Sequence, residues 1–356
     1  MQDKKRGIMP FSTQNRQGTI KGIAFIAIIA ITATIISQIG VVKALGISPL
    51  VVGIVIGIIF ANTIHDKIPT QWETGITFSA KKILRFAIVF YGFRITFQQI
   101  GEVGLEGFLV SLIMLSTTFV LGTWLGTKIF KMDEDTSMLT AAGASVCGAA
   151  AVLATEPVLK AEEHKAAIAV SMVVLFGTIA MFLYPVLYTS GILDMDAKEF
   201  GIYVGGTIHE VAQVVAVPAS IPGLDVEAAN AAVIVKMTRV IMIAPMLIAL
   251  GIYLSFKAKK EGGESSTVKL VIPWFAVYFI GVAGFNSLHL VPEAIVNMIN
   301  EVDTFLLTMA MTALGFGTRF AKFKGLGMAP LYTALGMFVW LVVGGYFITK
   351  GICTIF

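Results

Sequence analysis

The chain has 356 residues, of which 56% are hydrophobic and 13% are charged, and its mean hydropathy is +0.86. An average soluble domain carries about 25% charged residues, so this composition excludes a soluble globular protein. The formal net charge of +4 fits basic loops at one membrane face and does not indicate nucleic-acid binding. Two cysteines, Cys147 and Cys353, do not form the pattern of a disulfide framework. We therefore predict an all-α, polytopic membrane protein in contact with the lipid bilayer.

Apolar runs long enough to cross a bilayer, about 18 residues or more, recur from end to end. We predict a cytoplasmic tail over residues 1–19 and a single transmembrane domain over 20–356. The first run is longer than the core of a signal peptide and is not expected to be cleaved. The eleven candidate spans are 20–42, 48–64, 76–98, 105–127, 137–158, 165–188, 200–217, 228–255, 270–290, 293–318 and 329–352.

The basic residues predict how these spans are oriented. With a cytoplasmic N-terminus, 19 of the 26 lysines and arginines fall on the inner side and 5 on the outer side. The remaining two, Lys236 and Arg239, lie within a span. Cytoplasmic loops are enriched in Lys and Arg, so the count predicts the N-terminus inside and the C-terminus outside.

Two weak internal echoes indicate inverted repeats. The run from Tyr91 to Phe97, followed by a long apolar helix, is similar to the run from Leu314 to Phe320. These copies are seven crossings apart and so point in opposite directions, as in many secondary transporters. A weaker echo links span 137–158 with span 200–217, and these copies are parallel unless one of them is re-entrant. The sequence leaves open whether these two spans are full crossings or re-entrant.

Lys236 and Arg239 are the most unusual residues of the chain, because each charge costs about 2.5–3.5 kcal/mol at the centre of a membrane helix. Their spacing of three places them on one helix face, which we expect to look into protein or a polar cavity. One hypothesis is a paired cationic site for a small inorganic or organic anion. The alternative is that they pair with Glu210, Glu156 or Asp303 and only hold helices together.

The run from Gly205 to Gln213 contains a second group of candidates. Gly206 and Thr207 belong to a small-residue helix break, while His209 or Glu210 would take up and release a coupling proton or cation. Gln213 shares a helix face with His209 and replaces the second histidine of the H-E-x-x-H pattern, so we predict no metal site. The alternative is a helix terminus with solvated polar groups.

The run from Gly143 to Ala151 is a further candidate helix break. Its Ser145, Cys147 and Gly148 would line the site, where the free N–H groups of a half-helix bind an anion. The alternative is a helix-packing face of small residues. Arg94 is a candidate second anion contact or an interfacial arginine, and Asn286 either lines the pathway or bonds across helices.

The sequence resembles the YeiH-like family, bacterial inner-membrane proteins that carry a TauZ-type sulfate-exporter label. The resemblance covers nearly the whole chain and depends on five motifs taken together, at 91–94, 147–151, 205–213, 235–240 and 314–317. It implies a fold related to that of cation/proton antiporters and bile-acid symporters, with inverted repeats and discontinuous helices. Span 137–158 lacks a counterpart of the antiporter carboxylates, which argues against simple sodium/proton exchange.

We therefore expect a secondary transporter that exports a small anion, sulfate or a related sulfur oxyanion, across the inner membrane. The alternatives are a proton-linked cation exchanger, a membrane-embedded enzyme or sensor, and a membrane protein of uncharacterised function. The chain contains no P-loop motif, and we expect no enzymatic activity, no cofactor and no metal. The oligomeric state is not fixed by the sequence, and a homodimer remains open. The residues expected at the substrate site are Lys236, Arg239, Ser145, Cys147, Gly148, Gly206, Thr207 and Asn286; the coupling residues are His209, Glu210 and Gln213, with Arg94 as a further contact.

Overall fold

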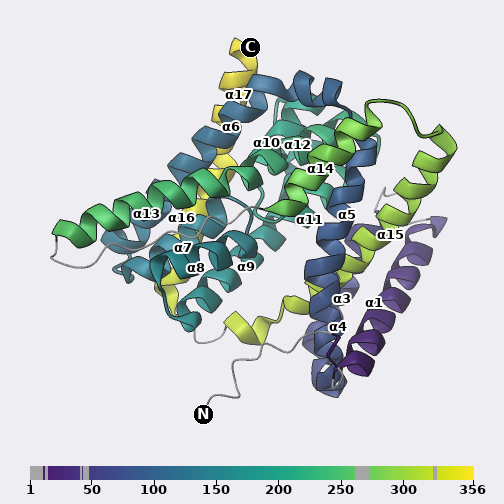
Figure 1. The fold of residues 1–356 in the computed structure, drawn as a ribbon, viewed down its shortest axis with the longest axis horizontal. Helices are drawn as coiled ribbons and strands as arrows, with labels where there is room; N and C mark the ends of the chain where they lie inside the picture. Colours follow the sequence, from purple (N-terminus) through teal and green to yellow (C-terminus); the bar gives the residue numbers. More distant parts are fainter. Residues whose placement is uncertain (1–10, 13–14, 41, 43–47, 261–272, 324–326) are drawn as a thin grey trace. The chain divides into compact units, whose positions relative to one another are not determined.

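A computed structural model of the chain describes residues 11–12, 15–40, 42, 48–260, 273–323 and 327–356 (Figure 1). Most of the tail predicted over 1–19 lies outside these ranges. Every regular element among the described residues is a helix. Contacts divide the chain into two compact units. Unit 1 comprises Met1–Thr96, Ala219–Gly223 and Tyr278–Ala321, and unit 2 comprises Phe97–Pro218, Leu224–Val277 and Lys322–Phe356.

Among the described residues, six helices are long and apolar enough to cross a membrane. They are Arg16–Ser37, Phe97–Ile129, Glu163–Thr189, Val226–Lys257, Glu293–Gly317 and Met328–Ile355. Three shorter apolar helices, Pro49–Thr63, Ala149–Leu159 and Trp274–Asn286, accompany them. These helices confirm the prediction of an all-α polytopic membrane protein.

Unit 1 combines the first helices of the chain with one long helix from its last quarter. Its elements are α1 (Arg16–Ser37), α3 (Pro49–Thr63), η2 (His65–Lys67), η3 (Thr70–Trp72), α4 (Glu73–Phe78), the π-helical η4 (Ser79–Ile83), α5 (Leu84–Tyr91), η5 (Gly92–Arg94) and α15 (Glu293–Gly317). The helix α14 (Trp274–Asn286) begins in unit 2 and ends in unit 1, and η8 (Phe320–Phe323) begins in unit 1 and ends in unit 2.

Glycines let the α3 and α15 backbones approach closely. A Cβ added to Gly57 would lie 2.3 Å from the carbonyl oxygen of Thr312, and one added to Gly53 would lie 2.6 Å from its hydroxyl. Gly315 is equally tight against α3. The close contact expected from the spacing of Gly53 and Gly57 is therefore confirmed.

The core of unit 1 lies among α1, α3 and α15. Its buried residues are Ile26, Ile29, Ala30, Ala61, Met309, Ala313 and Phe316. The Phe316 ring contacts Phe25 and Phe60 edge-on, with centroids 5.6 Å and 6.2 Å away. Such contacts fix the rotation of each helix as well as its position.

Unit 2 contains the remaining helices. They are α6 (Phe97–Trp124), the π-helical η6 (Leu125–Ile129), α7 (Glu134–Ser145), α8 (Ala149–Leu159), α9 (Glu163–Thr189), α10 (Ala197–Thr207), α11 (Val211–Ala216), η7 (Pro218–Ser220, which begins in unit 2), α12 (Val226–Ile241), α13 (Ile243–Lys260), α16 (Met328–Val339), the π-helical η9 (Trp340–Gly344) and α17 (Gly345–Ile355). Helix α6 runs antiparallel to α16–α17, because Gly122 lies beside Met337 and Gly345 lies near Met114.

Candidate functional site

Two helices of unit 2 break in the middle of candidate spans. Helix α7 ends at Ser145, Gly148 has φ 74°, and α8 begins at Ala149. Helix α10 ends at Thr207, and α11 begins at Val211. Both breaks fall within the small-residue runs that the sequence indicated, although the second comes two residues after Gly205-Gly206. The discontinuous helices are therefore confirmed.

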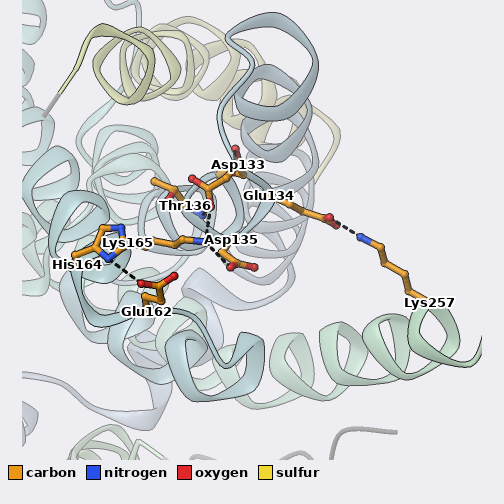
Figure 2. Close-up of polar contacts among 9 residues, drawn as sticks. Asp133, Glu134, Asp135, Thr136, Glu162, His164, Lys165 and Lys257 are labelled. Carbon is orange, nitrogen blue, oxygen red and sulfur yellow. Dashed lines mark hydrogen bonds and ion pairs between the residues drawn. The ribbon is translucent and has the colours of Figure 1, made fainter. Parts of the chain in front are cut away.

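The first broken helix returns to the end at which it started. Lys165, in the first turn of α9, forms ion pairs with Asp133 (3.0 Å) and Asp135 (2.8 Å) at the start of α7 (Figure 2). Helix α8 ends at Leu159, only four residues before α9 begins. The start of α7, the end of α8 and the start of α9 thus lie together. Residues 134–159 form a re-entrant segment, which we call the first segment.

The second broken helix enters from the other end of unit 2. The ring of Tyr188, near the end of α9, lies 4.2 Å from that of Phe200 in the first turns of α10. Helix α12 starts at the same end and runs parallel to α10, because Gly201 packs against Ala228 and Gly205 against Ala232. The chain after Thr207 must therefore come back before α12 begins.

The second segment, residues 197–216, is thus also re-entrant. The question that the sequence left open is answered by these contacts: 137–158 and 200–217 are not single crossings. Half-helices of this kind expose free backbone N–H and C=O groups at their broken ends, which need partners inside the protein. We call residues 144–149 the first tip and residues 205–210 the second tip.

The two tips meet through Glu210. Its Oε1 accepts a hydrogen bond from the backbone N–H of Ala149 at 2.9 Å, at the start of α8. The same residue caps α11, where the Glu210 N–H donates to Oε1 of Gln213 at 3.2 Å. A carboxylate at a helix N-terminus is stabilised by the helix dipole. Glu210 therefore links the two tips.

Lys236 joins the tips at their carbonyl oxygens. From the fully buried side chain, Nζ donates to the carbonyl of Val146 at 2.7 Å and to that of Ile208 at 2.6 Å. These two oxygens follow the last turns of α7 and α10, where helix dipoles concentrate negative partial charge. One lysine thus stabilises the broken ends of both segments.

Arg239, also fully buried, makes the matching contacts one helical turn later. Its Nη2 donates to Ser145 O (2.6 Å) and Ala144 O (3.2 Å), and its Nε donates to Ser145 O at 3.2 Å. Its Nη1 contacts Gly205 O (3.3 Å) and Ile208 O (3.4 Å). Among the described residues, the hydrogen-bond acceptors of both cations are backbone carbonyl oxygens rather than the carboxylates that the sequence offered as partners.

The other residues of the second tip are buried but differently satisfied. Thr207 donates to Tyr203 O at 2.6 Å and accepts from the Tyr184 hydroxyl at 3.0 Å. In the part of the chain that the structure describes, Nδ1 of His209 and Nε2 of Gln213 are buried without a hydrogen-bond partner. The second tip and the adjacent helix α11 therefore each contain a buried polar atom that has no hydrogen-bond partner among the described residues.

Most of the predicted site residues come together at the tips. Ser145, Cys147 and Gly148 form the first tip; Gly206, Thr207, His209 and Glu210 form the second; and Lys236, Arg239 and Gln213 contact them. Sequence reasoning missed Tyr184, which bonds Thr207, and Lys165, which pairs with Asp133 and Asp135. A signal for Lys165 existed in the three consecutive acids, Asp133 to Asp135, at the start of α7.

Arg94 and Asn286 belong to unit 1. Arg94 Nη2 donates to Asn300 O at 2.5 Å and to Thr304 Oγ1 at 2.8 Å, and it lies 3.5 Å from Oδ2 of the buried Asp303. The amide of Asn286 donates to Ile95 O at 3.1 Å. Arg94 therefore bonds η5 to α15, which the sequence did not predict, whereas the contact of Asn286 favours the alternative of a bond across helices.

Comparisons with known proteins agree with the sequence motifs. A family described as "Conserved hypothetical protein 698" matches residues 21–334. The UPF0324 inner membrane protein YeiH of Escherichia coli K12 is 48% identical over 326 residues, which cover 92% of each chain. A UPF0324 membrane protein of Pseudomonas putida is 44% identical over 340 residues, covering 96% of this chain and 95% of that protein. No solved structure matches.

Proposed function

Because the chain belongs to the UPF0324 family of membrane proteins, which includes YeiH, we propose that it is a secondary transporter that moves a small anion through unit 2. The observation that carries the proposal is the meeting of two re-entrant segments, from opposite ends of unit 2, at a buried lysine and a buried arginine. Broken helices whose ends face one another near mid-membrane are how many secondary transporters build their substrate sites.

The charges at the tips favour an anion over a cation. Lys236 and Arg239 bring two positive charges, and Glu210 brings one negative charge. The N-termini of α8 and α11 and the C-termini of α7 and α10 also meet there, and their opposite partial charges offset one another. With all three side chains ionised, the buried centre carries one excess positive charge. A buried net charge is costly, and a bound anion would neutralise it.

The single excess positive charge at the tips favours a singly charged substrate. Sulfate carries two negative charges at neutral pH, whereas an organosulfonate presents three oxygens on a tetrahedral sulfur with one negative charge. Among the sulfur oxyanions that the family resemblance suggests, we therefore propose an organosulfonate-like monoanion before sulfate itself.

The re-entrant segments also strengthen the proposed orientation. If 137–158 and 200–217 both re-enter, nine candidate spans remain crossings and the termini stay on opposite sides. Lys160 and Lys165 then move to the inner side and Lys198 to the outer side, which leaves 20 basic residues inside and 4 outside. This asymmetry is larger than that of eleven crossings and supports a cytoplasmic N-terminus.

Flux measurements on the purified protein in liposomes test the proposal. We expect labelled methanesulfonate to exchange across the membrane, faster than labelled sulfate, and to raise the midpoint of thermal unfolding of the detergent-purified protein, because it binds the folded state. Protein-free liposomes are the control. Absence of flux for methanesulfonate, sulfate, nitrate and chloride alike would refute an anion carrier.

A proton-linked cation exchanger is the second candidate, because Glu210 lies at one tip together with His209, whose buried Nδ1 has no hydrogen-bond partner among the described residues. The two functions differ in what collapses a pH gradient in the liposomes. Sodium or potassium with gluconate as the counter-ion would collapse it in a cation exchanger and leave it intact in the anion transporter that we propose.

A further inference from the structure

We propose that Lys236 is the proton carrier of the transport cycle, and that each monoanion crosses together with one proton bound at its Nζ atom. This inference rests on the proposed anion transport and names its coupling group. The geometry that carries it is the position of Nζ between the two tips, 2.7 Å from Val146 O and 2.6 Å from Ile208 O.

The number of N–H groups on Nζ differs between the two protonation states of Lys236. A neutral amine has two N–H donors and one lone pair, and an ammonium has three donors. Among the described residues, Val146 O and Ile208 O are the acceptors that Nζ uses. The neutral amine therefore satisfies both carbonyls and holds the tips together. Protonation at the lone pair adds one N–H and one positive charge. A bound monoanion accepts a hydrogen bond from the added N–H and balances the added charge.

The groups around Lys236 determine the net charge of the site in its empty and its loaded state. Arg239 on α12 and Glu210 on the second tip offset each other when Lys236 is neutral. Among the described residues, Cys147 on the first tip and His209 on the second also lie close enough to Lys236 to interact electrostatically with it. Tyr184 of α9 lies equally within electrostatic reach of Arg239. With these three neutral, the empty site with an amine and the loaded site with an ammonium plus a monoanion both have no net charge.

Arg239 cannot take this role. A guanidinium stays protonated in proteins and presents five N–H donors. The described residues place carbonyl oxygens of Ala144, Ser145, Gly205 and Ile208 around all three nitrogens of Arg239. Its charge is therefore constant and balances Glu210, while the charge of Lys236 varies with the load.

Transport by this scheme is electroneutral. A pH gradient drives the anion toward the alkaline side, and a membrane potential alone drives nothing, because the proton and the anion move together. In the loading step the lone pair of the amine takes a proton from the aqueous side that supplies the anion. In the release step the ammonium returns the proton to water on the other side.

Liposomes containing the full chain test the coupling. With the potential clamped by valinomycin and potassium, we expect labelled methanesulfonate to accumulate when the outside is acid, to an extent that does not change with the clamped potential. Lys236→Arg fixes the positive charge, so both the accumulation driven by pH and the uptake of a proton on methanesulfonate binding should be lost. Lys198→Arg, whose lysine pairs with Glu106 at 3.0 Å in the same unit, is the matched control and should retain both.

Accumulation driven by pH in Lys236→Arg, or accumulation in the wild type that follows the membrane potential, would overturn the inference. A second measurement needs no variant. When methanesulfonate is added to the weakly buffered, detergent-purified wild type, the protein should take up about one proton per bound anion, and a pH indicator dye measures this uptake. Binding without proton uptake overturns the inference, whereas absence of flux for methanesulfonate, sulfate, nitrate and chloride alike refutes the proposed function itself.

Discussion

Glu210 and Gly148 lie so close together that a Cβ on Gly148 would sit 2.2 Å from Oε1 of Glu210. The same carboxylate oxygen accepts the N–H of Ala149 at 2.9 Å. Gly148 also has φ 74°, a conformation that L side chains rarely adopt. The contact between the two re-entrant segments therefore depends on the absence of a side chain at this position.

Replacement of Gly148 by alanine should separate the tips. Backbone strain at positive φ costs about 1–2 kcal/mol, and the added methyl group must also displace the Glu210 carboxylate from the start of α8. We expect a lower midpoint of thermal unfolding and loss of methanesulfonate flux in liposomes.

The matched control for this substitution is Gly191→Ala. Gly191 has the same φ of 74° but no atom within 4 Å of an added Cβ. It should show the cost of backbone strain alone and keep its flux. Equal loss of flux in both variants would contradict the importance that we give to the contact with Glu210.

Glu210→Gln should uncouple anion binding from proton binding. The amide oxygen can still accept the Ala149 N–H, but the negative charge is gone, so Arg239 alone then balances a monoanion. We expect methanesulfonate to bind with little proton uptake, measured by calorimetry in buffers of different ionisation enthalpy. Glu106→Gln, at a carboxylate paired with Lys198, is the control and should leave proton uptake unchanged. Undiminished uptake in Glu210→Gln would argue against the charge balance at the tips.

The pair of Arg94 and Asp303 predicts an asymmetry in stability. Arg94→Ala leaves the carboxylate of Asp303, which is 1% exposed, without its counter-charge. Asp303→Asn leaves Arg94 with the carbonyl of Asn300 and the hydroxyl of Thr304. We therefore expect Arg94→Ala to cost more, about 1–3 kcal/mol, because an uncompensated buried group carries its full desolvation cost.

The double variant Arg94→Ala/Asp303→Asn is the control for this pair and should recover part of the loss, because no buried charge remains. Thermal unfolding in detergent measures all three variants. If Asp303→Asn were the more damaging single change, the arginine would not be serving mainly as the partner of Asp303.

The sequence predicted which residues meet at the tips because its signals were local. Two cations within an apolar run and two small-residue runs are visible without a structure, and the fold brings them together. It could not predict the partners of Lys236 and Arg239, because a backbone carbonyl carries no residue-specific signal. The acids that sequence offered were visible, and one of them, Asp303, pairs with Arg94 instead.

The sequence left open whether 137–158 and 200–217 are re-entrant, and the reason is their length. Helices α7 and α8, with the turn between them, occupy about as many residues as one membrane crossing, so hydropathy cannot tell a hairpin from a span. The distinction lies in non-local contacts, above all the ion pairs of Lys165 with Asp133 and Asp135. The distribution of Lys and Arg between the two sides of the membrane also favours re-entrance. It does so only when both segments are taken as re-entrant at the same time.

The cluster around Lys165 predicts how the protein responds to acid (Figure 2). Asp133 caps α7 by accepting the Thr136 N–H at 3.1 Å, and it lies 3.0 Å from Lys165. Partial burial by itself would raise the pKa of Asp133, but the hydrogen bonds from Thr136 and Lys165 outweigh it and hold the pKa below its ordinary value. A carboxyl whose pKa is lowered by folding stabilises the folded state above its unfolded pKa of about 4, and that stability is lost as the pH falls through the folded value.

We therefore expect the thermal unfolding midpoint to fall below about pH 4, and Asp133→Asn to flatten that fall, because asparagine keeps the helix cap without the titrating charge. The measurement is thermal unfolding in detergent from pH 3 to pH 7. Asp194→Asn, at a side chain that is 95% exposed and 3.9 Å from Lys350, is the control and should follow the wild type. If Asp133→Asn kept the full acid sensitivity, other carboxyls would have to account for it, and the start of the first segment would not depend on the ionised Asp133.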